Sequence, residues 1–136
     1  MDKEFALGSS TQSADQQTLV LVVDDNEDNL LLLAFVVEQL DCQIITALDG
    51  KTALDLAQDY HPSLILLDMM LPDMDGMEVL SHLKQNPITK TIPVIAVTAM
   101  AREQDRDRIL LAGCNEYVSK PYAVDELEML LRRYLD

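Results

Sequence analysis

Long apolar runs are missing from this sequence. No segment approaches the roughly 18 consecutive apolar residues that a membrane-spanning helix needs, and no basic, hydrophobic leader stands at its start. The 136 residues are nevertheless 49% hydrophobic, which is enough to fill the core of one domain. These features predict one globular domain that makes no contact with a membrane.

Basic residues are also scarce. Ten lysines and arginines stand against 24 aspartates and glutamates, so the formal net charge is −14. A charge of this size and sign repels a phosphate backbone, which argues against direct binding of DNA or RNA. It favours cations as ligands.

Cysteine and glycine are both rare. The two cysteines, Cys42 and Cys114, lack the spacing of metal ligands, and we expect them to be reduced, partly buried residues of a cytoplasmic protein. With four glycines, the chain has no glycine-rich loop that could bind a phosphate group. This absence counts against a nucleotide-binding or flavin-binding module.

The apolar pattern divides the chain into a short tail and one α/β domain. Residues 1–18 are polar and lack periodicity, so we expect a disordered tail or linker there, followed by a domain over residues 19–136. Five mainly apolar segments are predicted to be strands: Leu19–Val23, Gln43–Ala47, Leu64–Leu67, Pro93–Thr98 and Glu116–Ser119. Helical patterns between them predict a parallel sheet covered by helices on both faces.

Five helices are predicted, each with boundaries marked by capping or breaking residues. These are Asn26 or Asp25 before the first helix, Asp49-Gly50 and His61-Pro62 around the second, Asn86-Pro87 after the third, Arg102 and Gly113 around the fourth, and Lys120-Pro121 before the last. Helical spacing assigns the following residues to the buried faces: Leu30, Leu33, Ala34, Val37 and Leu40; Ala53, Leu54 and Ala57; Met77, Leu80 and Leu83; and Leu127, Leu130, Leu131 and Tyr134.

Acidic residues follow two of the predicted strands. Asp24 and Asp25 come after the first strand, and Asp68 comes after the third. Because parallel strands end at one edge of the sheet, three carboxylates should meet there. They would repel one another without a cation, and carboxylates with no histidine or cysteine nearby are suited to Mg²⁺.

Two further side chains stand at the same strand ends. Thr98 ends the fourth strand and Lys120 follows the fifth, so a hydroxyl and an ammonium group could bind a phosphate near the metal. This set suggests that Asp68 attacks a phosphorus atom and forms an acyl phosphate. The segment around Asp68 alone also permits a simpler role, in which the carboxylate only caps the helix after the turn.

Four segments together resemble the receiver domain of two-component response regulators. VVDDNEDN, LILLDMMLPDMDG, PVIAVTA and YVSKP occur in the order and at the spacings of that family, and the likeness covers about residues 19–135. It implies a flavodoxin-like, doubly wound fold with the sheet order 2-1-3-4-5. It also implies a signalling phosphoacceptor that takes a phosphoryl group from a phosphohistidine, not an enzyme beyond catalysing its own phosphorylation and dephosphorylation.

The resemblance assigns the metal site and the phosphoacceptor to single residues. Asp68 would be the phosphoacceptor. Asp25, the Asp68 carboxylate and the backbone carbonyl of Met70 would bind Mg²⁺ directly, and Asp24 would act on the metal through water.

The resemblance also implies a switch and its partners. Thr98 would be the hydroxyl that moves to the phosphoryl group, and Tyr117 the aromatic residue that turns inward afterwards. Lys120 would bind the phosphate, placed by a cis Lys120–Pro121 peptide bond. The donor would be a sensor histidine kinase or a phosphotransfer protein. A downstream protein would bind the face formed by the helix over residues 102–112, the strand over residues 116–119 and the last helix.

Methionines bear on an alternative function and on a difference from the receiver family. A Mg²⁺-dependent phosphatase of the haloacid-dehalogenase type also forms an aspartyl phosphate, but those enzymes carry an acid two residues after the nucleophile, where this chain has Met70. Met100 stands two residues after Thr98. Neither thioether can orient an attacking water by hydrogen bonds, so we expect a long-lived acyl phosphate unless these methionines only pack loop against loop.

Overall fold

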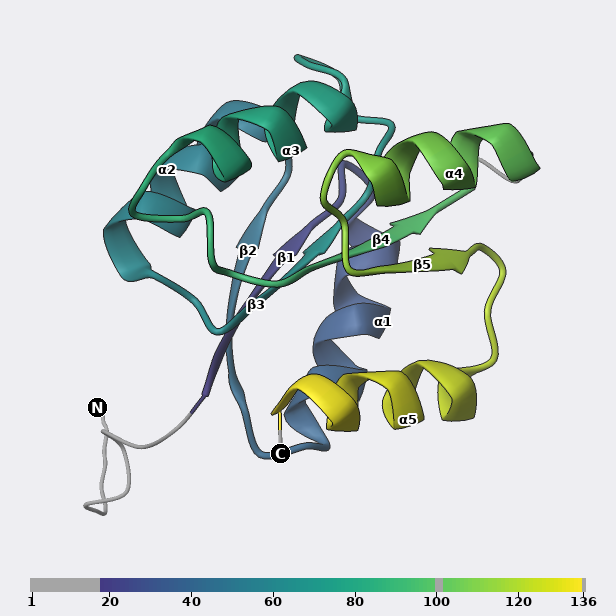
Figure 1. The fold of residues 1–136 in the computed structure, drawn as a ribbon. Coiled ribbons are helices and arrows are strands. Elements are labelled where there is room, and N and C mark those ends of the chain that lie inside the picture. The colour runs from purple at the N-terminus through teal and green to yellow at the C-terminus, as the bar shows by residue number, and fades with distance from the viewer. Residues whose placement is uncertain (1–17, 100–101, 136) are drawn as a thin grey trace.

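The computed structural model describes residues 18–99 and 102–135. Its elements in chain order are β1 (Leu19–Val23), α1 (Glu27–Glu38), β2 (Gln43–Ala47), α2 (Gly50–Tyr60), β3 (Leu64–Leu67), α3 (Gly76–Gln85), β4 (Val94–Thr98), α4 (Glu103–Leu111), β5 (Glu116–Ser119) and α5 (Val124–Leu135). The strands form one sheet in the order β2-β1-β3-β4-β5, and every neighbouring pair is parallel (Figure 1). The predicted flavodoxin-like α/β fold is confirmed.

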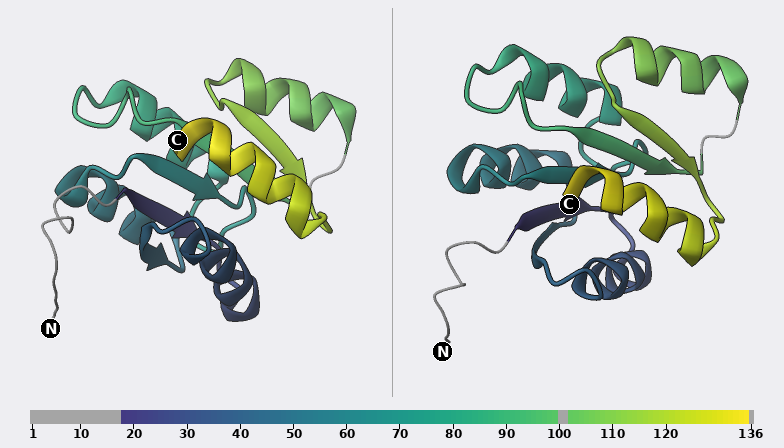
Figure 2. Two further views of the ribbon diagram at one scale, coloured as in Figure 1. Left: turned by 90° about the horizontal axis from the view of Figure 1, so that it is seen from below. Right: turned by 60° about the horizontal axis from the view of Figure 1, so that its bottom comes forward.

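Helices cover both faces of this sheet. α1 and α5 lie on one face, and α2, α3 and α4 lie on the other (Figures 1 and 2). Strands β3 and β4 are buried along their whole length, as is most of β1, so alternate side chains enter two separate cores. Leu66 belongs to the core under α1 and α5, for example, and Leu67 to the core under α2, α3 and α4.

Capping residues set the helix ends close to their predicted positions. Asn26 caps α1, because its side-chain oxygen accepts a hydrogen bond from the Asn29 N–H at 3.0 Å. α2 ends before His61 as predicted, but it does so through a left-handed residue with φ 47°, not through an extended one. Gly113, with φ 110°, follows α4 and ends it.

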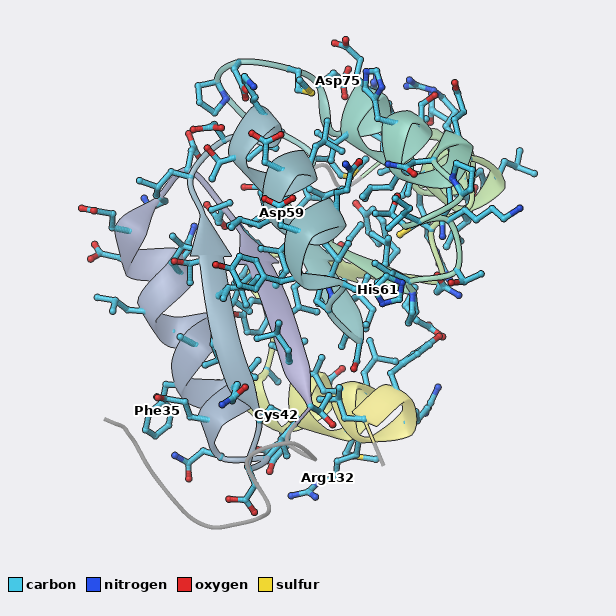
Figure 3. All side chains as sticks on the ribbon, turned by 90° about the vertical axis from the view of Figure 1, so that its left-hand side faces the viewer. Phe35, Cys42, Asp59, His61, Asp75 and Arg132 are labelled. Atoms are coloured by element: carbon cyan, nitrogen blue, oxygen red, sulfur yellow. The ribbon has the colours of Figure 1, made fainter. Side chains whose placement is uncertain are left out.

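Helical spacing identified most of the buried positions and missed some. Val36 and Val79 are buried although they were not assigned to the core, and Ala34 is only half-buried. α1 is apolar nearly all round, so periodicity alone could not separate its two faces. Leu31 and Phe35 on its outer side are 70% and 57% exposed, and Figure 3 shows Phe35 there.

The predicted tail over residues 1–18 lies almost entirely outside the described residues, so its boundary stays a prediction. Among residues 18–99 and 102–135, no helix has the length and apolar character needed to cross a membrane. Cys114 is buried and Cys42 is half-buried, as expected.

Candidate functional site

Strand register brings two of the predicted acids side by side. Val23 at the end of β1 lies between Ala47 of β2 and Leu67 of β3. The next residues, Asp24 and Asp68, continue these pairings: the Asp24 N–H donates to the Ala47 carbonyl at 3.1 Å, and the Asp68 N–H donates to the Val23 carbonyl at 2.9 Å. Both carboxylates are therefore fixed at the carboxyl edge of the sheet by backbone hydrogen bonds.

Three carboxylates meet at this edge. Asp24, Asp25 and Asp68 each offer an oxygen, and these oxygens lie within 4.8 Å of one another. Asp24 is 1% exposed and Asp68 is 6% exposed, whereas Asp25 faces solvent. A cluster made only of carboxylate oxygens, with one side open to water, suits a hard divalent cation that keeps part of its water shell.

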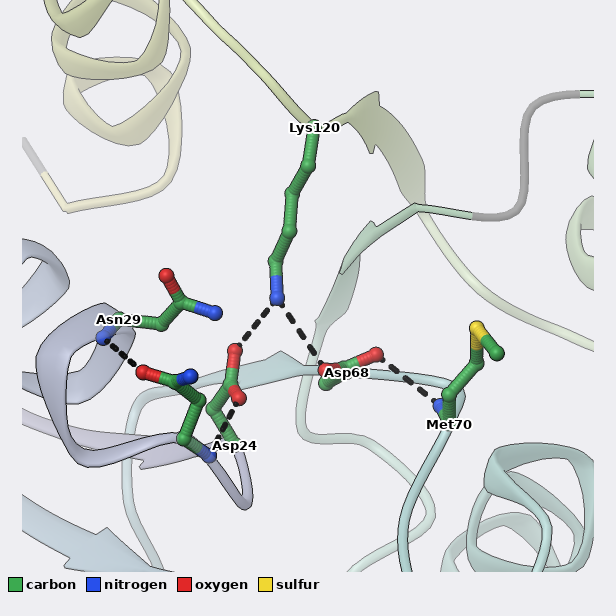
Figure 4. Close-up of polar contacts among 6 residues, drawn as sticks. Asp24, Asn29, Asp68, Met70 and Lys120 are labelled. Atoms are coloured by element: carbon green, nitrogen blue, oxygen red, sulfur yellow. Dashed lines mark hydrogen bonds and ion pairs between the residues drawn. The ribbon is translucent and has the colours of Figure 1, made fainter.

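Lys120 reaches the cluster from the other end of the chain. Its Nζ lies 2.6 Å from Asp24 Oδ2 and 3.2 Å from Asp68 Oδ2 (Figure 4). Burial disfavours the charged ammonium, but the hydrogen bonds and charges of the two aspartates outweigh it and raise the pKa of Lys120. One ammonium against three carboxylates leaves negative charge that a bound cation would balance.

The Asp68 carboxylate is held in place and made more basic. The Met70 N–H donates to Asp68 Oδ1 at 3.0 Å (Figure 4). Burial raises the pKa of Asp68, and the nearby charge of Asp24 adds to this, while the Met70 hydrogen bond and Lys120 oppose it. Burial and the Met70 hydrogen bond therefore act together on the charge and the orientation of this carboxylate.

Thr98 and Tyr117 lie on the side of the site formed by β4 and β5. Thr98 is fully buried at the end of β4, and its carbonyl accepts a hydrogen bond from the Lys120 N–H at 2.9 Å. The following peptide bond, Lys120–Pro121, is cis. Tyr117 is half-buried and packs against the core under α2, α3 and α4. Its hydroxyl is buried and has no hydrogen-bond partner within residues 18–99 and 102–135.

Asp73 and the pair Tyr134–Glu116 were not found from the sequence. Asp73 binds two backbone N–H groups of α2, which are 23 and 22 residues away in the chain. The Tyr134 hydroxyl donates to Glu116 Oε2 at 2.7 Å and joins α5 to β5. Neither contact follows from periodicity or from a local motif. The only signal for Asp73 was its place in the turn-rich segment after Asp68.

Comparison with known sequences decides the family. The sequence model of the response regulator receiver domain matches residues 20–132. The chain belongs to this family. Among curated proteins, the polar-differentiation response regulator DivK of Brucella ovis is 42% identical over 116 residues, which cover 85% of this receiver and 94% of DivK.

Solved receiver structures agree. The receiver domain of the sensor histidine kinase PA1611 from Pseudomonas aeruginosa, determined with a magnesium ion coordinated in the active-site cleft, is 30% identical, with a TM-score of 0.80 over 88% of this chain and 98% of that chain. The chemotaxis protein CheY4 of Vibrio cholerae shares the fold at 24% identity, with a TM-score of 0.81 over 88% of this chain and 99% of that one. None of these matches supports the phosphatase alternative.

Proposed function

We propose that Asp68 is the phosphoacceptor of this receiver and that it works with Mg²⁺. Asp25, the Asp68 carboxylate and the Met70 carbonyl would bind the metal directly, and Asp24 would act through a water molecule. One observation carries the proposal. Three carboxylates from two strand ends lie within 4.8 Å of one another, and Lys120 is hydrogen-bonded to two of them.

The chemistry is transfer of a phosphoryl group from nitrogen to oxygen. An oxygen of Asp68 attacks the phosphorus atom of a phosphohistidine, the phosphorus–nitrogen bond breaks, and the electron pair returns to the imidazole, which leaves protonated. Mg²⁺ supplies positive charge to the phosphoryl oxygens. Lys120 stabilises the same oxygens after turning from the carboxylates, and the Thr98 hydroxyl donates a hydrogen bond to them. The domain would catalyse its own phosphorylation and dephosphorylation and no reaction on other phosphoesters.

The surface beside the site supports a protein as the phosphoryl donor. α1 exposes Leu31 and Leu32 in its first half, which follows the acids, and Phe35 near its other end. A largely apolar hollow adjoins this helix, lined by Asn29, Leu32, Ala99, Lys120, Pro121 and Tyr122. Apolar surface that is exposed beside a reactive group marks a site of protein contact. We therefore take the donor to be a sensor histidine kinase or a phosphotransfer protein.

The downstream partner would bind the face formed by α4, β5 and α5. β5 is the edge strand of the sheet and is only half-buried, and α4 buries two of its residues, Asp105 and Ile109. Such loose packing lets this face change when Thr98 and Tyr117 respond to the phosphoryl group. Direct binding of nucleic acid is not part of the proposal, because the net charge of −14 opposes it.

We place this activity in the cytoplasm. The Cys114 Sγ lies 3.0 Å from the Glu116 carbonyl and the Cys42 Sγ lies 3.5 Å from the Leu40 carbonyl, distances that suit thiols donating hydrogen bonds. Reduced cysteines are typical of the cytoplasm.

Intact-mass analysis after incubation with acetyl phosphate and Mg²⁺ tests the phosphoacceptor. We expect one added phosphate that hydroxylamine removes, and none in Asp68→Asn. Equal labelling of Asp68→Asn would refute the proposal.

Amide exchange of the phosphorylated protein tests the partner face. The exchange should change in α4 and β5, and changes confined to α2 would contradict the proposed partner face.

A further inference from the structure

The loop between β3 and α3 carries Met70, the residue whose carbonyl is proposed to bind Mg²⁺. Two contacts close the base of this loop. The Gly76 N–H donates to the Met69 carbonyl at 3.0 Å, and Met70 forms an antiparallel bridge with Asp75. The outer part of the loop is held by different contacts.

Asp73 attaches the outer part of the loop to the first turn of α2. Its Oδ1 accepts a hydrogen bond from the Gly50 N–H at 2.8 Å, and its Oδ2 accepts one from the Lys51 N–H at 3.0 Å. Both donors belong to the helix N-terminus, where N–H groups lack partners within the helix and favour negative charge. These bonds, that of Gly50 first, hold the pKa of Asp73 below its usual range.

The sequence around these residues permits the close approach. A Cβ at Gly50 would collide with the side chain of Met74, which packs against the first residue of α2. Any residue other than glycine would force the side chain of Met74 to shift from this packing. Asp73 and Met74 therefore hold the loop against α2 through both oxygens of one carboxylate and through direct packing.

The anchoring point on α2 is itself connected to the acid cluster. α2 begins three residues after Ala47, the last residue of β2, and the Ala47 carbonyl accepts the N–H of Asp24. A backbone hydrogen bond, a short stretch of chain and the Asp73 hydrogen bond thus link Asp24 through Ala47 and Gly50 to Asp73. They join the end of β1 to the loop that carries Met70.

We propose that Asp73 is a positioning residue for the metal site: it orients the β3–α3 loop so that the Met70 carbonyl faces the cation held by Asp25 and Asp68. The inference rests on the metal site proposed above. Asp73 lies outside the cluster of Asp24, Asp25 and Asp68, and its carboxylate is turned to the N–H groups of α2. Its effect is on the affinity for Mg²⁺ and not on the chemistry at Asp68.

Asp49 provides a matched control. Its Oδ1 accepts a hydrogen bond from the Thr52 N–H at 2.8 Å, so it caps the same end of α2 but makes no hydrogen bond to the β3–α3 loop within the part of the chain that the structure describes. Asp49→Ala and Asp73→Ala each remove one negative charge and hydrogen bonds to the first turn of α2. A role in capping α2 alone predicts similar effects for both variants, whereas a role in positioning Met70 predicts an effect on Mg²⁺ for Asp73→Ala alone.

Isothermal titration calorimetry with Mg²⁺ separates these roles, and it suits a chain without tryptophan. We expect Asp73→Ala to bind Mg²⁺ about tenfold more weakly, the lower range for loss of a group that orients a metal ligand. Asp49→Ala should change the affinity less than about twofold, although both variants should melt at lower temperature. Asp73→Asn keeps one acceptor for the Gly50 N–H and should lie between Asp73→Ala and wild type.

Phosphorylation by acetyl phosphate gives a second measurement. In Asp73→Ala the Mg²⁺ concentration for half-maximal rate should rise about tenfold while the maximal rate stays near that of wild type. Wild-type Mg²⁺ affinity in Asp73→Ala, or equal losses in Asp73→Ala and Asp49→Ala, would overturn this inference alone. An Asp25→Ala variant that binds Mg²⁺ like wild type would instead overturn the proposed metal site.

Discussion

The two parts of the chain that meet at the site differ in charge. Residues 18–83, from β1 to most of α3, contain 13 acidic residues and one basic residue, Lys51. Residues 84–135, which include β4 to α5, contain seven acidic and eight basic residues. All three carboxylates of the site come from the acidic part, and Thr98 and Lys120 come from the part of mixed charge.

This difference separates two tasks within one site. The acidic part would hold the proposed cation at strand ends that are fixed by backbone hydrogen bonds, and β1 and β3 are buried on both faces. The part of mixed charge carries the groups that we propose bind the phosphate, on the side where β5 is half-buried. On the proposed function, the more buried segments would carry the chemistry and the less buried ones would form the face that reports it.

Removal of Lys120 should have the largest effect, because this residue joins the two parts. We expect Lys120→Ala to accept phosphate from acetyl phosphate about a hundredfold more slowly, since a preorganised charge at the phosphoryl oxygens is lost. Its affinity for Mg²⁺ should be equal or higher, because the ammonium no longer competes for Asp24 and Asp68. Quenched time courses analysed by intact mass measure the phosphorylation rate, and calorimetry measures the affinity for Mg²⁺.

Lys51→Ala is the matched control for this prediction. It removes a lysine whose side chain is 79% exposed and pairs with Asp55 at 3.6 Å, so both measurements should stay near wild type. Equal phosphorylation rates in Lys120→Ala and wild type would mean that the two parts do not cooperate through this residue.

Mg²⁺ should stabilise the fold through the acidic part alone. At a Mg²⁺ concentration one hundred times its Kd, we expect about 2.7 kcal/mol of added stability, because only the folded chain brings the three carboxylates together. Asp25→Ala should lose most of this gain. Asp28→Ala, an exposed acid outside the cluster, should keep it. Urea unfolding with and without Mg²⁺ provides the comparison, and an undiminished gain in Asp25→Ala would place the metal elsewhere.

The two parts also differ in how far the sequence predicted them. Asp24, Asp25 and Asp68 were found because each follows an apolar strand, and the order of parallel strands places such residues at one edge. Thr98 and Lys120 were placed at the same edge by the same argument, whereas the switch roles of Thr98 and Tyr117 came from the likeness to a family. Asp73 and Glu116–Tyr134 were missed because each contact joins segments that only the folded chain brings together.

The methionines near the site should slow loss of the phosphate. Met70 is 57% exposed beside Asp68 and offers no polar group to orient a water, while Met100 lies outside the described residues. We expect the double variant Met70→Asn, Met100→Glu to lose its phosphate ten- to thirtyfold faster than wild type, a change of about 1 to 2 kcal/mol in the barrier. Intact-mass analysis measures the loss of phosphate from each protein after the donor is removed. Equal rates of phosphate loss in the double variant and wild type would show that these methionines only pack loop against loop.

The hydrogen bond between Tyr134 and Glu116 should give the smallest effect, and it lies in the part of mixed charge. Burial first, and then the hydrogen bond to the Glu116 carboxylate, raise the pKa of Tyr134 to about 12. The protonated hydroxyl therefore stabilises the fold fully below the unfolded pKa of 10.0, and this contribution is lost as the pH rises towards about 12. We expect Tyr134→Phe to cost about 1 kcal/mol at pH 8.

Urea unfolding of wild type and Tyr134→Phe from pH 8 to pH 11 measures this difference, which should shrink as the pH rises. Glu116→Gln completes a double-mutant cycle, because the bond joins only these two side chains. The same variants should leave Mg²⁺ affinity unchanged, since neither residue belongs to the acid cluster. A loss of Mg²⁺ affinity in Tyr134→Phe would mean that the packing of α5 against β5 influences the carboxylates of the acidic part. That result would contradict the assignment of the two tasks to separate parts of the chain.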